Sequence, residues 1–411
     1  MTITPHPILL TAANAPEALR GLPAFARRGF AIGLRLQAGT LTVTIPDGRS
    51  FRIEAPGPGP EATFAIHDWR FARRLLQAGD IGVGEAFMAG EWSSPDPTAF
   101  LELFAANRQV MMDALAGNPV ARAIVSFRHF LNRNSRAGSR RNIAAHYDLG
   151  NAFYSAWLDP SMTYSSAYFG AGANNLEAAQ RDKYREIAAR TDIGPGDHVL
   201  EVGCGWGGFA EFAAREIGCR VTAVTISRAQ HDYARKRISD AGLNDRVTVD
   251  LVDYRDLKGS YDRIVSIEMF EAVGERFWPG YFQMLRDRLR SGGRAGLQII
   301  TVEDAHFEAY RRAPDFIQRY IFPGGMLPSP SRVGALADEA GLTATHEAGF
   351  GGDYARTLAE WRDRFRAAWP RLAPGGFDDR FRRMWEFYLH YCEAGFRAGA
   401  IDVKHFVFAR P

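Results

Sequence analysis

A short apolar run leading into a glycine-rich turn constrains this chain more than any other stretch. Residues 198–202 read His-Val-Leu-Glu-Val, residues 203–208 read Gly-Cys-Gly-Trp-Gly-Gly, and apolar residues at helical spacing follow from Phe209. This order predicts a strand, a tight turn and the start of a helix. Glycines let the backbone adopt positive φ and approach a ligand closely, and open α/β sheets bind ligands beyond such strand ends. The turn therefore predicts a ligand site on an α/β sheet.

The residues of the turn narrow the class of ligand. A phosphate-binding loop requires a lysine followed by serine or threonine. Residues 203–208 contain no lysine, which disfavours phosphate binding. The remaining common user of this turn is S-adenosylmethionine, whose carboxypropyl and ribose groups need backbone N–H donors and a carboxylate. Glu201 supplies a carboxylate at the end of the strand.

Composition limits the other classes. The chain has 411 residues, 46% of them hydrophobic and 24% charged, which indicates a globular protein of two or three domains. A net charge of +3 does not indicate a nucleic-acid partner, and three cysteines form neither a disulfide framework nor a metal-ligand spacing. The N-terminus does not have the pattern of a secretory signal, and no apolar run is long enough to span a bilayer. We therefore expect a cytoplasmic protein whose membrane contact is peripheral.

The spacing of apolar residues predicts two domains. Alternation at 41–45 and 51–53 predicts a β-hairpin, 56–60 reads as a loop and 62–66 as another strand, so that residues 1–120 form a small α+β domain. From residue 143 to 411, short buried-type strands alternate with helices: the strands lie at 199–202, 220–224, 247–251, 263–267 and 295–300. This alternation predicts an α/β fold with a mostly parallel sheet covered on both faces.

Residues 121–142 form a basic linker between the two domains. Arginines recur from Arg122 to Arg141, with apolar residues between them. One interpretation is a solvated, arginine-rich helix. The other is a patch that contacts anionic lipid head groups, where each basic side chain adds about 1 kcal/mol of attraction. The sequence leaves both interpretations open.

Polar residues follow the next two strands. Thr225 and Gln230 lie after the second strand, in the region where a dinucleotide-binding or typical methyltransferase fold has an acidic residue for the ribose hydroxyls. Asp253 follows the third strand, where a carboxylate would meet an adenine amino group. Each residue alone is more often a helix cap or a surface residue. In this order, after this turn, they favour a ligand site.

The chain resembles a family at this point: the cyclopropane-fatty-acyl-phospholipid synthases, together with the related mycobacterial mycolic acid methyltransferases. The resemblance covers nearly all of residues 140–411. Its motifs lie at 146–151, 158–168, 203–208, 225–230, 268–274, 320–329 and 352–358. The N-terminal part is similar to the small lipid-carrier-like domain of bacterial members, most clearly at 79–90. The resemblance implies a Rossmann-like class I methyltransferase domain.

The resemblance also implies an activity. Members transfer the methyl group of S-adenosylmethionine to a cis double bond of a phospholipid acyl chain. The residues expected to bind the cofactor here are Tyr164, Ser165, Glu201, Gly203, Gly205, Gly207, Thr225, Gln230, Asp253, Tyr254 and Ile267. The implied partner is the anionic surface of a bilayer, at the inner face of the membrane, and the family is compatible with a homodimer.

The chemistry of an alkene acceptor explains a further set of residues. An alkene is a poor nucleophile, and attack on the methyl group leaves a carbocation that needs a negative neighbour and then a base. The resemblance implies that a bicarbonate ion is this base. Its ligands here would be Ser166, Glu271, Gln298, the backbone at Ile300 and Tyr354.

Three positions of this pocket depart from the enterobacterial pattern. That branch has cysteine in place of Ser166 and histidine in place of Ala272 and Gln298. The combination found here is similar to that of the plant synthases and their bacterial relatives. Serine and glutamine still offer hydrogen bonds, so an anion can be held, but the departures weaken the inference about the product.

Alternatives to ring formation remain open. If the carbocation loses its proton from the new methyl group, a cyclopropane ring closes; if it loses a proton from an adjacent chain carbon, a methyl-branched alkene results. A second enzymatic reading is N- or O-methylation of a small acceptor. A non-enzymatic reading is a lipid-binding protein with a relict methyltransferase domain, against which Glu201, the glycine turn and Glu271 all argue. Cyclopropane formation is the first expectation.

Overall fold

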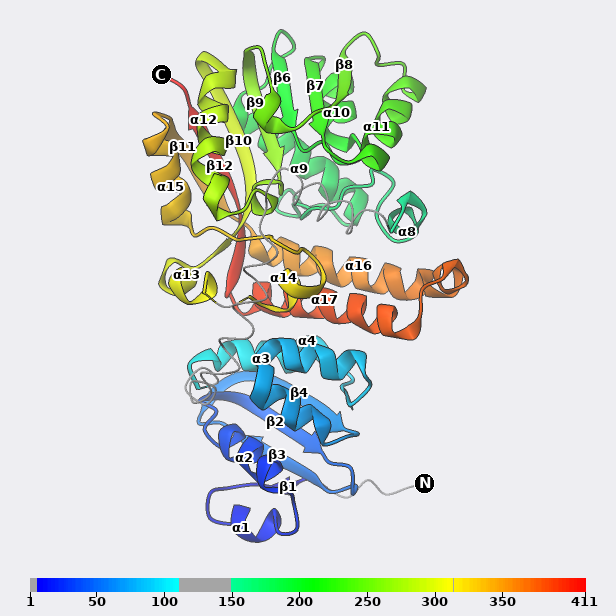
Figure 1. Ribbon diagram of the computed structural model, residues 1–411, viewed down its shortest axis with the longest axis vertical. Coiled ribbons are helices and arrows are strands. Elements are labelled where there is room, and N and C mark those ends of the chain that lie inside the picture. Colours follow the sequence, from blue (N-terminus) through cyan, green and yellow to red (C-terminus); the bar gives the residue numbers. More distant parts are fainter. Residues whose placement is uncertain (1–5, 111–148, 313) are drawn as a thin grey trace. The chain divides into compact units, whose positions relative to one another are not determined.

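The computed structural model describes residues 6–110, 149–312 and 314–411, which form two compact units (Figure 1). Of these residues, the N-terminal unit takes 6–110, 314–320 and 373–400. The second unit takes 149–312, 321–372 and 401–411. The predicted boundaries, 1–120 and 143–411, therefore do not coincide with the compact units. All of the predicted basic linker, 121–142, lies outside the described residues, and so do its arginines.

A five-stranded sheet forms the base of the N-terminal unit, in the order β1-β3-β2-β4-β5. Its strands are β1 (Ile8–Leu9), β2 (Ala38–Thr44), β3 (Ser50–Glu54), β4 (Gly57–Ile66) and β5 (Trp92–Ser93). The antiparallel pairing of β2 with β3 confirms the predicted hairpin. The predicted loop at 56–60 is wrong, because β4 already begins at Gly57. A Cβ atom there would lie 2.7 Å from the carbonyl oxygen of Gln37, so glycine permits this close strand approach.

The helices of the N-terminal unit come from both ends of the chain. They are α1 (Ala15–Ala18), α2 (Ala24–Gly33), α3 (Arg70–Met88), α4 (Pro97–Ala106), α14 (Phe316–Tyr320) and α17 (Asp379–Arg397). Phe387 of α17 packs against Phe87 and Phe316, with ring centroids 5.7 Å and 4.6 Å apart. The Tyr391 hydroxyl donates to the buried Asp80 carboxylate at 2.8 Å. These contacts explain why a segment predicted within the second domain joins the first.

The second unit contains a seven-stranded sheet in the order β11-β12-β10-β9-β6-β7-β8. Its strands are β6 (His198–Val202), β7 (Arg220–Thr225), β8 (Val247–Leu251), β9 (Tyr261–Ile267), β10 (Leu289–Val302), β11 (Thr343–Gly349) and β12 (Ile401–Ala409). Strands β6 to β10 pair in parallel, and β12 pairs antiparallel with β10 and β11. The predicted α/β fold with a mostly parallel sheet is confirmed.

Helices cover both faces of this sheet (Figure 1). One apolar core joins Val199, Val221 and Val265 to α9 (Leu176–Thr191), α10 (Gly208–Phe212) and α11 (Arg228–Asp240). A second core joins Leu200 and Ile264 on the opposite face to α12 (Trp278–Arg288) and α15 (Pro330–Glu339). Successive strand residues thus enter opposite cores, as the two-residue period of a strand requires.

The remaining elements of this unit lie around the sheet. They are α8 (Asn151–Ser155), α13 (Asp304–Tyr310), α16 (Gly351–Leu372), a π-helical turn at Ala213–Ile217 and 3₁₀ turns at Tyr254–Asp256, Phe270–Ala272 and Glu275–Phe277. The turns at 254–256 and 270–272 follow the carboxyl ends of β8 and β9, the edge at which open α/β sheets bind ligands. Among the described residues, no helix is long and apolar enough to cross a membrane.

Candidate active site

The glycine turn connects β6 to α10 as predicted. Its residues Gly203, Gly205 and Gly207 have φ values of 86°, 53° and 83°, a region that L side chains rarely adopt. A Cβ atom on Gly203 would lie 2.6 Å from the Met269 side chain, whereas one on Gly205 would meet no atom within 4 Å. The backbone at Gly205 therefore borders open space, which a ligand can approach closely. The Trp206 indole donates to Asn151 at 2.8 Å and so ties the turn to α8.

The Glu201 side chain is buried, and the residue lies in β6 just before the glycine turn. Burial raises the pKa of its carboxyl group to about 8, although the Lys183 ammonium opposes this shift. Its Oε2 atom has no hydrogen-bond partner among the described residues. A buried carboxylate oxygen without a partner is costly, and a hydroxyl or cationic ligand would remove that cost.

Ser165 contacts Lys183, the residue whose charge acts on Glu201, and Tyr164 directly precedes Ser165. The Lys183 ammonium donates to the Ser165 hydroxyl at 2.7 Å, and the Ser165 carbonyl oxygen accepts from the Gln180 amide at 2.9 Å. The Tyr164 ring packs near Trp361, with ring centroids 5.2 Å apart. The segment is thereby held between α9 and an aromatic wall.

The residues expected after the second and third strands have protein partners. The Thr225 hydroxyl donates to the Gln230 side-chain oxygen at 3.0 Å. The Asp253 carboxylate pairs with the Arg255 guanidinium at 2.6 Å. Tyr254 lies in the following 3₁₀ turn, where burial raises the pKa of its hydroxyl to about 12. Ile267 is the last residue of β9, at the edge next to the turn. The expected cofactor contacts of these residues stay predictions.

Glu271 and the Ile300 backbone, both expected as ligands of a bicarbonate ion, contact each other directly. The 3₁₀ turn after β9 carries Glu271, whose Oε1 atom accepts from the Ile300 backbone N–H at 2.6 Å. Its Oε2 atom has no hydrogen-bond partner among the residues that the structure describes. Burial, followed by the negative charge of Glu268, raises the pKa of Glu271 to about 8. A bound cation would favour the ionised form of this carboxyl group.

Ser166, Gln298 and Tyr354 converge on Glu268, a residue to which the sequence assigned no role. Glu268 Oε1 accepts from the Ser166 backbone N–H at 2.8 Å and from the Gln298 amide at 2.7 Å. Glu268 Oε2 accepts from the Tyr354 hydroxyl at 2.7 Å. The Ser166 hydroxyl points elsewhere and donates to the Ala167 carbonyl oxygen at 2.9 Å. Three of the groups expected to hold a bicarbonate ion thus bind a carboxylate of the chain itself.

Lys183 is the second residue that the sequence did not single out. It is fully buried on α9, and burial lowers the pKa of its ammonium group to about 7 against the attraction of Glu268, Asp159 and Glu201. A lysine on the buried face of a helix is rare, and its signal in the sequence is weak: Lys183 follows Leu176 and Ala179 at helical spacing. Glu268 had a signal too, since it directly follows a buried strand at the ligand-binding edge of the sheet.

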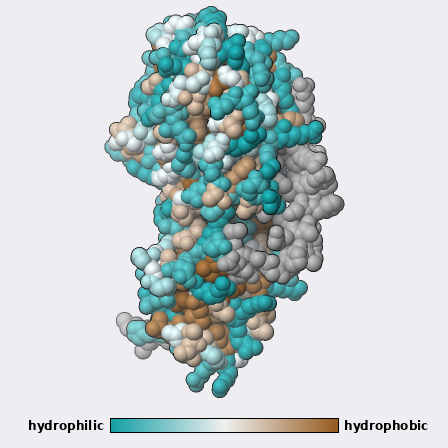
Figure 2. Space-filling model, turned by 90° about the vertical axis from the view of Figure 1, so that its left-hand side faces the viewer, coloured by the Kyte–Doolittle hydropathy of each residue, from teal (hydrophilic) through white to brown (hydrophobic). Residues whose placement is uncertain are grey.

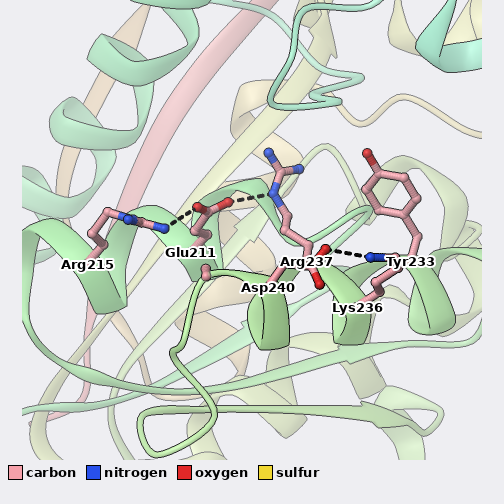
Figure 3. Close-up of a pocket in the computed structure, with 7 residues that line it drawn as sticks. Glu211, Arg215, Tyr233, Lys236, Arg237 and Asp240 are labelled. Carbon is pink, nitrogen blue, oxygen red and sulfur yellow. Dashed lines mark hydrogen bonds and ion pairs between the residues drawn. The ribbon is translucent and has the colours of Figure 1, made fainter.

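A separate pocket of about 520 Å³ lies on the helix layer at α10 and α11 (Figure 3). It is lined by Glu211, Arg215, Tyr233, Lys236, Arg237, Asp240 and Ala241. Glu211 pairs with Arg215 at 2.8 Å and with Arg237 at 2.6 Å, and Lys236 pairs with Asp240 at 2.6 Å. The lining thus has three basic and two acidic side chains that pair with one another, and we interpret this pocket as a charged surface rather than as part of the active site.

Comparison with known proteins identifies the family. The model of the mycolic acid cyclopropane synthetase family matches residues 134–406, more than half of the chain. The chain belongs to this family. This member is an S-adenosylmethionine-dependent methyltransferase.

Relatives of this family member cover most of its length. The tuberculostearic acid methyltransferase UfaA1 of Mycobacterium tuberculosis is 41% identical over 367 residues, 87% of this chain and 85% of that protein. The cyclopropane-fatty-acyl-phospholipid synthase of Escherichia coli is 35% identical over 377 residues, 90% of this chain and 95% of that protein. The structure of the mycolic acid cyclopropane synthase CmaA1, complexed with SAH and CTAB, is similar with a TM-score of 0.61 and 30% identity. It covers 66% of this chain and 97% of its own.

The residues of this family member fit S-adenosylmethionine. The open space at Gly205 admits a ligand to the backbone, and the unpartnered oxygen of Glu201 can accept from it. The ligand supplies an electrophilic methyl group when bound. Bicarbonate fits less readily, because the Ser166, Gln298 and Tyr354 donors are already engaged by Glu268.

Proposed function

We propose that this chain transfers the methyl group of S-adenosylmethionine to a cis double bond in a phospholipid acyl chain, with a cyclopropane as the product. The observation that carries the proposal is the pair of glutamates directly after β9, Glu268 and Glu271, which are half-buried residues whose carboxyl groups are desolvated, so that the pKa of each is raised. Methylation of an alkene carbon creates a carbocation, which needs a negative neighbour and a base in a site without water. Methylation of an amine or hydroxyl group does not create such a cation.

The surroundings of the carboxyl groups support an apolar acceptor. Tyr164 lies in a cluster of aromatic side chains: its ring centroid is 5.4 Å from that of Tyr154, 5.6 Å from that of Trp157 and 5.2 Å from that of Trp361. Aromatic rings also stabilise a nearby cation through their electron-rich faces. In the proposed reaction the Glu201 carboxylate and the glycine turn hold the methyl donor, and the aromatic wall orients the acyl chain.

A methyl-branched product is the second candidate, and one observation favours it. The relative UfaA1, which is 41% identical, is named a tuberculostearic acid methyltransferase, whereas the Escherichia coli relative, at 35%, is named a cyclopropane-fatty-acyl-phospholipid synthase. Both products require the same methyl transfer and differ only in which C–H bond is broken. The two buried carboxyl groups serve either outcome.

The test is an assay with vesicles of cis-unsaturated phospholipid, S-adenosylmethionine and the purified protein, followed by gas chromatography and mass spectrometry of the acyl chains. We expect an increase of one CH₂ unit together with loss of the double bond. An equal mass increase with the double bond retained would support the branched product. Activity on a small amine without vesicles, and no change in the lipid, would contradict the proposal. Failure to bind the cofactor in calorimetry would revive the non-enzymatic reading.

Membrane contact is part of the proposal, and the N-terminal unit supports it. Figure 2 shows apolar side chains (brown) on the visible surface of this unit. Large apolar residues that are exposed include Ile8 and Leu9 of β1 and Phe25 of α2, and Arg27 and Arg28 beside Phe25 are exposed as well. Apolar residues next to basic ones suit the interface of an anionic bilayer. We propose peripheral contact with the inner face of the membrane.

Replacing Phe25 by serine tests this contact. Phe25 is 36% exposed and its ring packs against Trp69, with ring centroids 6.3 Å apart, so the substitution removes exposed apolar surface together with part of this packing. We expect binding to vesicles with anionic lipid, measured by co-sedimentation, to weaken by about tenfold, since burial of an aromatic ring contributes roughly 1.5–3 kcal/mol. Leu251→Ser is the matched control, because Leu251 is 37% exposed in the other unit. Equal binding by Phe25→Ser and the wild type would exclude this residue from the contact.

A further inference from the structure

We propose that Glu268 is the base that removes the proton after methyl transfer, in the place where the resemblance to the family implies a bicarbonate ion. The inference rests on the proposed function, and it applies to the cyclopropane and to the branched product alike. It makes the chain independent of an added anion.

Glu268 receives three hydrogen bonds from three separate segments. The donors are the Ser166 backbone N–H at 2.8 Å, the Gln298 amide at 2.7 Å and the Tyr354 hydroxyl at 2.7 Å. All three residues belong to the set expected to hold bicarbonate. A carboxylate and a bicarbonate ion share the same planar CO₂⁻ group, so donors arranged for one suit the other. The anion is thus already present, attached to the chain.

The orientation of the Gln298 amide is fixed by a second contact. His405 Nε2 lies 2.9 Å from Gln298 Oε1. Burial lowers the pKa of His405 to about 3, so the ring is neutral at pH 7 and one of its nitrogens carries the proton. Gln298 Oε1 can only accept, so His405 Nε2 must donate. The Gln298 amide nitrogen is thereby turned toward Glu268, to which it donates at 2.7 Å, and it also donates to the Ser166 carbonyl oxygen at 3.3 Å.

The backbone at Glu268 is held in an unusual conformation. Its φ is 48°, one of three positive values among the described non-glycine residues. The Glu268 backbone N–H donates to the Gln298 carbonyl oxygen at 2.8 Å, which fixes the conformation. Left-handed conformations of bulky residues persist where the surrounding structure demands them, and they cluster at functional sites. Here the conformation sends the carboxylate toward the three donors.

Glu268 and Glu271 differ in their hydrogen bonds and in the charges near them, and we therefore assign them different roles. Glu268 accepts three hydrogen bonds and is attracted by the buried Lys183 ammonium, whereas Glu271 accepts one from Ile300 and is repelled by Glu268. Burial still raises the pKa of Glu268 above its ordinary value, which strengthens it as a base. Glu268 is therefore the better held anion, and Glu271 is the negative neighbour that favours the carbocation once the cationic cofactor is bound.

The proposed step transfers the methyl group and then a proton. The π electrons of the double bond form the new C–C bond to the methyl group while the C–S bond of the sulfonium breaks, leaving a neutral thioether and a carbocation on the chain. The electrons of one C–H bond then close the ring, or form a new double bond in the branched product. The released proton goes to a carboxylate oxygen of Glu268 and later to solvent. No oxidant or reductant is needed.

Two variants of Glu268, compared with the wild type in buffer depleted of bicarbonate and in buffer with added bicarbonate, test the inference. The wild-type protein is expected to methylate vesicle lipids at the same rate in both. Glu268→Gln keeps the shape but not the base, so we expect kcat to fall by about 100-fold or more with cofactor affinity unchanged in calorimetry. Glu268→Gly suits the positive φ and frees the three donors, so its activity should be low without bicarbonate and restored by it.

Rescue by bicarbonate distinguishes a base from a merely structural residue, because a packing defect would not respond to the ion. A wild-type rate that depends on bicarbonate would overturn the inference. So would a Glu268→Gln rate within about threefold of the wild type, or a Glu268→Gly variant that binds cofactor but is not rescued. If the wild type methylates no lipid under any condition, the proposed function fails first, and this outcome is recognised without any variant.

Discussion

Replacing Glu271 by glutamine is expected to reduce kcat for lipid methylation by about 100- to 1000-fold, the usual effect of removing one group that stabilises charge in a transition state. The Glu271 carboxylate lies beside Ile300, and one of its oxygens has no hydrogen-bond partner among the described residues. Glutamine keeps the acceptor for the Ile300 N–H but carries no negative charge. Rates with vesicle lipids and cofactor affinity by calorimetry measure the effect.

Cofactor affinity should stay within about threefold of the wild type in Glu271→Gln, because the charge acts on the cation that forms after binding. Glu275→Gln is the matched control: Glu275 lies four residues further along and pairs with Arg311 at the surface. We expect the control to keep the wild-type rate. Wild-type turnover by Glu271→Gln would refute the role assigned to this carboxylate.

Replacing Glu201 by glutamine is expected to weaken cofactor binding while raising stability in alkaline buffer. The unpartnered Oε2 atom of Glu201 lies at the entrance to the glycine turn. A hydrogen bond to a charged group contributes roughly 1.5–3 kcal/mol, so the dissociation constant should rise by about tenfold to a hundredfold. Calorimetric titration with S-adenosylmethionine measures this change. An unchanged dissociation constant would remove Glu201 from the cofactor site.

The effect of Glu201→Gln on stability depends on pH. Burial raises the pKa of Glu201 from 4.5 to about 8 in the folded protein. As the pH rises, the unfolded chain therefore releases this proton at a lower pH than the folded protein does. Between these two pKa values the free energy of unfolding of the wild type falls by on the order of 1.4 kcal/mol per pH unit. Below that window the carboxyl group is protonated in both states and the loss disappears. We expect the melting temperature of Glu201→Gln to exceed that of the wild type at pH 8.5 and to match it at pH 4.

An exposed glutamate, Glu177, provides the matched control for Glu201→Gln. Glu177 is exposed on α9, in the same unit, so Glu177→Gln should show no such dependence on pH. A variant Glu201→Gln less stable than the wild type at pH 8.5 would mean that the buried carboxylate is stabilised by its surroundings. That result would contradict the free oxygen seen beside the turn.

Local patterns were sufficient to predict much of this fold. Residues 199–202 form a buried strand before a turn whose glycines have positive φ, and 220–224 and 263–267 pair beside it in parallel. A two-residue period and a glycine turn are properties of neighbouring residues, so a sequence reveals them directly. The resemblance implied that Glu271 and the Ile300 backbone bind a common anion; the structure shows a direct hydrogen bond between them, and the anion stays a prediction.

The features that the sequence did not reveal depend on contacts between residues far apart along the chain. Glu268 was part of a recognised motif, but its three partners lie 102, 30 and 86 residues away along the chain. Lys183 reads as a polar residue on an ordinary helix until the packing of α9 buries it. The same holds for α17: its apolar face is evident in the sequence, but the elements that it covers, such as Phe87, are not.

The most direct test of the central claim follows the hydrogens of the transferred methyl group. The purified protein is incubated with vesicles of cis-unsaturated phospholipid and S-adenosylmethionine that carries a CD₃ group. Mass spectrometry then locates the label and counts its deuterium atoms. The proposed ring closure predicts label in the acyl chain with two deuterium atoms retained, one having been lost to the base. Three deuterium atoms in the acyl chain would indicate the branched product. Label confined to a head group or a small acceptor, with the acyl chains unchanged, would contradict the account.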